Sequence, residues 1–176
     1  DILNGNTSGD LWTVCRELSC RMLMLAGIGD RDECGRLVDE AVKSGEALKR
    51  FEMMVKLQGG DVSYIEDTSK FRKASFSREV YAPADGYITH MDSEKIGLTA
   101  VLLGAGREKK DDDINHAAGI IIAAKMGDFV KRGELLATLF ADDESRLDGA
   151  ESRYLSAVSI SDKKPAEQPM ILDYID

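Results

Sequence analysis

The apolar positions of the first sixty residues follow the period of an α-helix and predict three helices. In the first, side chains at intervals of three and four share one face: Leu11, Val14, Leu18, Met22 and Leu25. Asp30 and Glu33 resemble a capping box, so a second helix is predicted to start there and to end at Ser44. A third helix is predicted over residues 46–58, and its inward-facing side chains are Leu48, Phe51, Met54 and Val55.

Two glycines, Gly59 and Gly60, end the third helix and are followed by Asp61. This short sequence is as typical of a tight helix exit as of a ligand-binding loop, and its three residues are structural candidates. The methionines of this region fit flexible core fillers better than a cofactor-binding set: Met22, Met24, Met53 and Met54.

Beyond residue 70 the pattern changes from helical to β-rich. Strands are predicted over residues 76–82, 87–90, 119–122 and 134–140. The apolar run 98–103 is too short for its period to distinguish a strand from a helix. We predict a helix there, because Gly104 then takes the terminating position.

The change of pattern also suggests how the chain is organised. Residues 61–70 are polar, and we place a boundary after residue 67, which gives an N-terminal helical segment, 1–67, and a second domain, 68–176. Near the C-terminus, residues 152–160 alternate weakly and the following tail is predicted to be extended. The fold class predicted for the whole chain is α+β.

Composition and charge narrow the class of protein. The chain has 176 residues and a mass of 19.3 kDa, with 43% hydrophobic residues, which is typical of a globular protein with a packed core. It carries 23 basic and 32 acidic residues, a net charge of -9, which argues against nucleic acid or a membrane surface as a partner. No apolar run has the length of a membrane span and no signal segment is recognisable, so we expect a cytoplasmic protein. The missing initiator Met predicts a truncation.

Few side chains in the sequence suggest catalytic chemistry. Cys15, Cys20 and Cys34 lie in predicted helices without a C-x-x-C pair or a histidine cluster, so we interpret them as reduced thiols. His90 and His116 have no partner at a recognised motif spacing. The sequence therefore predicts no catalytic, substrate-binding or metal-binding residue in this chain, and it implies no disulfide.

Gly104-x-Gly106 next to Arg107 has two features of a phosphate-binding loop, because glycine lets backbone amides approach an anion and arginine supplies a fork of donors. The segment lacks the third glycine, the preceding strand and the Lys-Ser/Thr pair of the specific phosphate motifs. A turn with a structural arginine is therefore favoured. We expect Arg107 to pair with an acid among residues 111–113, and Asp113 is a structural candidate within a solvated, charged loop.

Two segments look like the halves of a biotinyl or lipoyl hammerhead, which is a barrel-sandwich-hybrid fold. They are residues 82–88 and residues 125–136, and the second contains Gly-Asp-x-Val-x-x-Gly-x-x-Leu. The glycines of this pattern suit turns, and its Val and Leu point into a small β-sandwich. A carrier domain needs a lysine on an exposed hairpin, and the residues after Phe140 offer none. A carrier role is therefore not favoured.

Taken in order over residues 10–140, these pieces resemble the C-terminal part of the pyrimidine-nucleoside and thymidine phosphorylases. The motifs that carry the resemblance include Gly45-Glu46-Ala47-Leu48-x-x-Phe51, Gln58-Gly59-Gly60-Asp61, Leu103-Gly104-Ala105-Gly106-Arg107 and Lys125-x-Gly127-Asp128-x-Val130-x-x-Gly133-Glu134-x-Leu136. The resemblance implies that residues 1–67 are the closing helices of the family's α/β lobe. Residues 68–176 would be its α+β C-terminal domain, with the hammerhead-like β core.

The resemblance implies pentosyl transfer by phosphorolysis, in which phosphate attacks C1′ of thymidine or uridine and releases the base and a (deoxy)ribose 1-phosphate. The family's phosphate loop, pyrimidine-binding group and structural cation site lie upstream of the matching segment. We therefore expect this chain alone to be an inactive monomer without a cofactor, and the full-length enzyme to be a homodimer with phosphate as co-substrate. Two alternatives stay open, an AMP phosphorylase and a non-catalytic hammerhead-type binding or carrier module.

Overall fold

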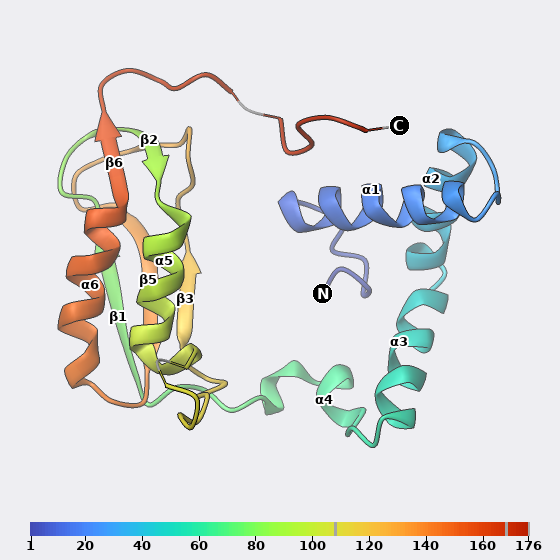
Figure 1. The fold of residues 1–176 in the computed structure, drawn as a ribbon, viewed down its shortest axis with the longest axis horizontal. Coiled ribbons are helices and arrows are strands. Elements are labelled where there is room, and N and C mark those ends of the chain that lie inside the picture. Colours follow the sequence, from blue (N-terminus) through green and yellow to red (C-terminus); the bar gives the residue numbers. More distant parts are fainter. Residues whose placement is uncertain (108, 168, 176) are drawn as a thin grey trace. The chain divides into compact units, whose positions relative to one another are not determined.

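The computed structural model describes residues 1–107, 109–167 and 169–175, which fall into two compact units (Figure 1). Unit 1 comprises residues 1–70 and 169–175, and unit 2 comprises the described residues between 71 and 167. The predicted boundary after residue 67 lies close to the division after residue 70, but the C-terminal segment groups with unit 1 rather than with the second domain. Within the described part of the chain, no helix has the length and apolar content that crossing a membrane requires.

Unit 1 is helical. Its elements are α1 (Asp10–Leu25), α2 (Arg31–Lys43), α3 (Glu46–Leu57), the short α4 (Ser63–Glu66) and the 3₁₀ turn η1 (Thr68–Lys70). The three predicted helices are thus confirmed. Asp30 caps α2 as predicted, because its carboxylate accepts a hydrogen bond of 2.8 Å from the backbone N–H of Glu33. Gly45 adopts the left-handed conformation, with φ 77°, and lets α3 begin shortly after α2 ends.

The apolar faces of these helices are largely exposed to solvent. On α1 the exposed fractions are 66% for Leu11, 60% for Leu18, 70% for Met22 and 90% for Leu25. On α3, Phe51 and Met54 are exposed while Leu48 and Val55 are half-buried, so the inward face predicted for α3 is confirmed only in part. Met22, Met53 and Met54 are exposed and do not fill a core. The physical reason is that α1 and α3 pack mainly against α2, which leaves their other faces uncovered within unit 1.

Unit 2 is built on two antiparallel sheets of three strands each. One has the order β1-β5-β3, formed by β1 (Phe76–Tyr81), β5 (Leu135–Ala141) and β3 (Gly119–Ile122). The other has the order β4-β2-β6, formed by β4 (Phe129–Val130), β2 (Gly86–Met91) and β6 (Val158–Ser161). The four predicted strands are confirmed as β1, β2, β3 and β5. Together with its helices, unit 2 makes the chain an α+β protein, as predicted.

Two helices pack together in unit 2, and α6 also packs on β1 and β5 (Figure 1). The first is α5 (Ser93–Ala100), which continues into the π-helical turn η2 (Val101–Ala105) and confirms the helix predicted over 98–103. The second is α6 (Ser145–Ala157), which the weak alternation of residues 152–160 did not predict. Its buried side chains recur at helical spacing: Leu147, Ala150, Tyr154 and Ala157.

The apolar core of the molecule lies in unit 2, among α6, η2 and the strands. Its largest fully buried side chains are Tyr154, Ile88, Leu103, Leu136, Leu139, Leu147, Val80 and Val130. Removing such a side chain from water contributes about 1.5–3 kcal/mol of stability. Through Leu103 this core fixes η2, and the structural candidates of unit 2 lie in and after η2.

Two similar four-residue turns account for the Lys-x-Gly-Asp/Glu repeats of the sequence. In the first, the Asp128 carboxylate accepts the N–H of Lys125 at 2.8 Å, and in the second the Glu134 carboxylate accepts the N–H of Lys131 at 2.9 Å. The third residue of each turn is a glycine with positive φ, 95° and 84°. The first turn exchanges two backbone hydrogen bonds with Ile88, and the second does so with Ala82. The first turn therefore bonds to the interior of β2, and the second bonds to the residue that follows β1.

Candidate functional site

The Gly59-Gly60-Asp61 candidate is a helix exit. Gly59 has φ 81° and its N–H donates to the carbonyl of Lys56 at 3.1 Å, while the N–H of Gly60 donates to Val55 at 2.9 Å. This pair of bonds is a Schellman motif, which satisfies the last carbonyls of α3. Asp61 then accepts the backbone N–H of Ser63 at 2.9 Å, and this bond lowers the pKa of the Asp61 carboxyl. All three residues serve the backbone, so the helix-exit interpretation is favoured over a ligand loop.

Gly104 and Gly106 turn the chain at the end of η2, each for a different reason. Gly104 has φ 107°, a conformation that side chains other than glycine rarely adopt. Gly106 has an extended backbone, with φ −146°, but a Cβ there would lie 2.7 Å from Cγ2 of Val101. Gly104 also accepts a hydrogen bond of 2.9 Å from the N–H of Asn115 through its carbonyl. Both glycines therefore have a conformational explanation within the turn itself.

Arg107 does not have the role that the sequence suggested. Its side chain is exposed, and it makes no hydrogen bond or ion pair with any residue in the described ranges. Asp113 is exposed as well, and the structure places no bond between it and Arg107. The expected pairing with an acid at 111–113 is therefore wrong, because solvent already satisfies both charges in this loop. Glu108, in the same charged segment, lies outside the described residues.

Another arginine, Arg146 on α6, contacts the η2 turn. Its Nη1 donates to the carbonyl oxygen of Leu102 at 3.2 Å, and its Nε lies 3.5 Å from the Asp143 carboxylate. The same Nη1 would lie 3.8 Å from a Cβ placed on Gly104. Arg146 thus connects α6 with the turn after α5, across 44 positions of sequence. No local pattern indicates this pairing.

Asp142 is the centre of a polar cluster beside the Gly104 turn. It follows β5 directly, and its Oδ1 accepts the N–H of Ser75 at 2.8 Å and the hydroxyl of Ser75 at 2.9 Å. Its Oδ2 accepts the amide of Asn115 at 2.9 Å and pairs with Arg72. Because Ser75 precedes β1, and β1 and β5 are paired, one carboxylate ties both strands to the segment that leads into β3. Through these bonds the cluster positions the backbone around Asp142.

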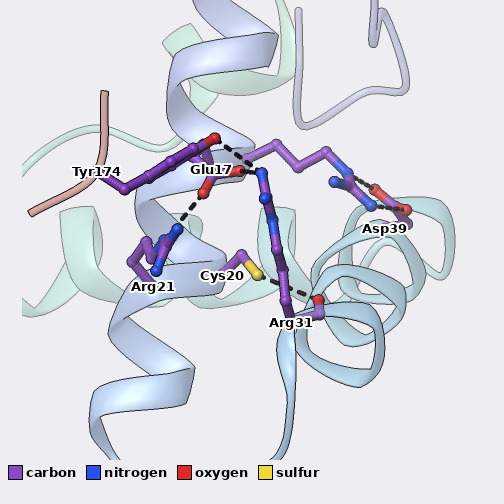
Figure 2. Close-up of polar contacts among 7 residues, drawn as sticks. Glu17, Cys20, Arg21, Arg31, Asp39 and Tyr174 are labelled. Atoms are coloured by element: carbon purple, nitrogen blue, oxygen red, sulfur yellow. Dashed lines mark hydrogen bonds and ion pairs between the residues drawn. The ribbon is translucent and has the colours of Figure 1, made fainter. Parts of the chain in front are cut away.

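A second polar cluster lies in unit 1, where Glu17 on α1 holds two arginines (Figure 2). Its carboxylate oxygens each accept one hydrogen bond of 3.0 Å, one from Nε of Arg21 and one from Nη2 of Arg31. The Glu17 side chain is only 12% exposed. Burial by itself would raise the pKa of this carboxyl, but the two arginines outweigh it and the pKa is lowered. Glu17 therefore stays ionised and fixes the direction of both guanidinium groups.

The same cluster contains a second link between α1 and α2 (Figure 2). Arg16 donates to both oxygens of Asp39, at 2.6 Å from Nε and 2.7 Å from Nη2, and this hydrogen-bonded pairing lowers the pKa of the Asp39 carboxyl. Gly35 makes room for it, because a Cβ on Gly35 would lie 2.8 Å from Nη2 of Arg16. A glycine in the interior of α2 thus has a packing explanation, which the sequence analysis missed.

Unit 1 also has an apolar groove of about 670 Å³ between α1 and α2. Its lining includes Trp12, Cys15, Met22, Leu37 and Val38. No charged side chain lines it, so the groove offers no acid, base or phosphate-binding group.

The described residues offer little further chemistry. Cys15 is exposed, Cys20 and Cys34 are buried and all three are free, as predicted; burial raises the pKa of the Cys34 thiol. His90 and His116 are exposed, and neither side chain bonds to another residue in the described ranges. Among the same residues, no three His, Cys, Asp or Glu side chains are grouped so as to hold a metal ion.

Comparison with known proteins identifies relatives of the whole chain. Residues 87–161 match the model of the family described as pyrimidine nucleoside phosphorylase C-terminal domain. The pyrimidine-nucleoside phosphorylase of Bacillus subtilis (strain 168) is 39% identical over 146 residues, which are 82% of this chain and 34% of the relative. That of Geobacillus stearothermophilus is 32% identical over 173 residues, 98% of this chain and 40% of the relative. The Staphylococcus aureus (strain USA300) protein of the same name is 35% identical over 163 residues, which are 92% of this chain and 37% of the relative.

These matches agree with the resemblance drawn from the short motifs of the sequence. The family model covers most of unit 2, and the matches to the relatives extend over the helices of unit 1 as well. The chain spans only 34% to 40% of the length of these relatives.

Proposed function

We propose that this chain is a C-terminal part of a pyrimidine-nucleoside phosphorylase. It supports the phosphorolysis reaction of the complete enzyme but does not itself contain the reacting groups. In that reaction phosphate attacks C1′ of a pyrimidine nucleoside, and the base leaves as a (deoxy)ribose 1-phosphate forms. The observation that carries the proposal is the match over 98% of the chain to an enzyme of this name. Thymidine and uridine are the proposed substrates.

The contacts within the chain support a scaffolding role. Phosphorolysis needs groups that bind phosphate, stabilise a cationic sugar and hold the departing base. In the two polar clusters, the charged groups of Glu17 and Asp142 are already bonded to arginines, amides and hydroxyls of the chain itself. The exposed apolar faces of α1 and α3 support packing against further polypeptide of the complete enzyme.

The proposal has a structural and an assembly component. We propose that unit 2 has the hammerhead-like core, which is supported by its two small sheets and its two glycine turns. We also propose that the complete cytoplasmic enzyme is a homodimer, that phosphate is its co-substrate, and that this chain alone is monomeric. The names of the relatives favour pyrimidine nucleosides over AMP as substrate.

The test compares phosphate-dependent release of thymine and uracil by three proteins. They are this chain alone, the Geobacillus stearothermophilus enzyme, and a chimera in which this chain replaces the matching part of that enzyme. We expect release by the enzyme and the chimera and none by this chain. Release by this chain alone would contradict the proposal, because it would place the reacting groups within these 176 residues.

A folded chimera without activity would also count against the proposal, provided that its thermal unfolding is cooperative. Intact mass after expression with biotin or lipoate tests the carrier alternative, because a carrier gains the mass of its cofactor.

A further inference from the structure

Unit 1 is built from two stretches of chain that are far apart in sequence. The chain leaves unit 1 after residue 70, forms unit 2, and contributes residues 169–175 to unit 1 again. The C-terminal segment, residues 169–175, forms no helix or strand. Its attachment therefore depends on side chains.

Tyr174 makes the attachment, as Figure 2 shows. Cζ of Arg21 lies 4.1 Å from the centre of the Tyr174 ring, and Cζ of Arg31 lies 4.9 Å from it. Both distances are within the range of cation–π attraction. Arg31 also donates a hydrogen bond of 2.8 Å from Nη2 to the Tyr174 hydroxyl. The ring is thus held by two guanidinium groups and the hydroxyl by one of them.

Exposure alone does not distinguish Tyr174 from the other side chains of the segment, because Ile171 is half-buried. Ile175 is fully exposed at 101%, Leu172 is 80% exposed, and Met170 is 47% exposed. Tyr174 is 38% exposed although it stands near the end of an irregular segment. What distinguishes Tyr174 is its hydrogen bond to Arg31 and the stacking of its ring against Arg21 and Arg31.

The receiving site is preformed, because Glu17 already holds both arginines. We name Arg21, Arg31 and Glu17 the arginine clamp. The buried carboxylate takes one hydrogen bond from each arginine, which leaves the guanidinium groups oriented with a net positive charge. An aromatic ring with an electron-rich face and an acceptor oxygen complements this arrangement.

We propose that Tyr174 in the arginine clamp fastens the C-terminal segment to unit 1, so that unit 2 is joined to unit 1 through two linkers instead of one. One linker follows Lys70, and the other is the stretch between unit 2 and Tyr174. A unit joined at both ends has fewer accessible arrangements than a unit joined at one end, because closing the loop removes chain entropy. Release of Tyr174 from the clamp therefore increases the mobility of unit 2.

The test alters the clamp and leaves the C-terminal sequence unchanged. Carboxypeptidase removes residues from the C-terminus, and mass spectrometry follows its progress past Tyr174 in the wild-type chain and in the Arg21→Gln, Arg31→Gln double variant. We expect trimming past Tyr174 to be roughly tenfold faster in the double variant, because proteolysis follows the detached population. Arg36→Gln is the matched control, because Arg36 is an exposed arginine of α2 outside the clamp. It should stay within about twofold of wild type.

Small-angle X-ray scattering on the same proteins measures the mobility of unit 2. The double variant should show a broader distribution of interatomic distances than wild type and Arg36→Gln. Equal trimming in the double variant and in Arg36→Gln would overturn the attachment. If the double variant is trimmed faster but its scattering profile is unchanged, Tyr174 does not restrict the mobility of unit 2, and that part of the proposal is overturned.

A second variant keeps the test decisive if the double variant does not fold. Tyr174→Phe keeps the ring and removes only the acceptor oxygen, so trimming should be roughly two- to fivefold faster than in wild type. Identical trimming of Tyr174→Phe and wild type would contradict the contribution of the hydrogen bond from Arg31.

Discussion

Unit 2 and unit 1 hold their elements together by different means. Unit 2 encloses a continuous cluster of apolar side chains between α6, η2 and its strands, with Leu139 and Ile88 fully buried. In unit 1 the buried apolar side chains are only Cys20, Cys34, Val38 and Val42 among the described residues. Its helices are linked instead by the arginine clamp and the Arg16–Asp39 pair. Because ion pairs that are partly exposed contribute little and buried apolar area contributes much, we expect unit 2 to be the more stable unit.

The largest effect on stability is expected from shortening a buried side chain in the core of unit 2. Leu139→Ala removes a fully buried side chain and should lower the free energy of unfolding by about 2–5 kcal/mol. The same change at Leu18, which is 60% exposed on α1, should cost about 0.5 kcal/mol or less. Urea unfolding monitored by circular dichroism measures both. Equal losses of unfolding free energy in the two variants would contradict the proposed difference in stability between the two units.

A smaller effect is expected at the turn after η2. Gly104→Ala forces a side chain into a backbone with φ 107° and should destabilise unit 2 by about 1–3 kcal/mol. Gly97→Ala in α5 is the control, because a Cβ on Gly97 meets no atom within 4 Å. Alanine favours a helix interior over glycine, so this variant should gain about 0.5–1 kcal/mol. Thermal unfolding of the two variants measures both changes in stability. A Gly104→Ala variant more stable than wild type would contradict the predicted backbone strain at Gly104.

The next prediction concerns the buried hydroxyl of Tyr154 in the core of unit 2 and whether it has a hydrogen-bond partner. Its hydroxyl is buried without a hydrogen-bond partner among the described residues, and burial raises the pKa of the phenol. Tyr154→Phe removes this unbonded group and should stabilise unit 2 by about 1 kcal/mol. Differential scanning calorimetry measures the gain. A loss of stability would instead indicate that a buried water bonds the hydroxyl.

The smallest effect concerns the pH dependence of unit 1. A carboxyl with a lowered pKa, as at Glu17, stabilises the fold above its unfolded pKa, and this contribution is lost as pH falls through the folded pKa. Unit 1 should therefore lose about 1 kcal/mol or less as the pH drops below about 4.5. Glu17→Gln should make this acid-induced loss of stability smaller. Glu40→Gln, at an exposed site of α2, should leave the loss unchanged. Acid titration followed by the fluorescence of Trp12 distinguishes the two variants.

Local signals in the sequence predicted the elements well. The Asp30 cap, the glycine exit of α3 and the Gly104 terminator depend on residues within a few positions of each other. The helix α6 was not predicted, because the weak alternation over residues 152–160 combines the end of this helix with the strand β6. Periodicity predicted the apolar face of α1 but not its exposure, because exposure depends on which elements pack against that face.

The contacts of the candidate sites depend on the tertiary fold and could not be predicted in the same way. The charges beside Arg107 suggested a local pair, whereas Arg146 reaches the turn across 44 positions. The bond from Arg31 to Tyr174 spans 143 positions. Pairings of this kind follow from the fold, and the sequence contains no short-range pattern that specifies them.

The two-part composition of unit 1 has a consequence for the order of events during translation. A ribosome makes residues 1–70 before unit 2, and residues 169–175 only after the whole of unit 2. The arginine clamp is then exposed in the nascent chain until Tyr174 is made, while unit 2 has all of its residues earlier. Domains generally fold as units during synthesis, so unit 2 is able to reach its native contacts before unit 1 is complete.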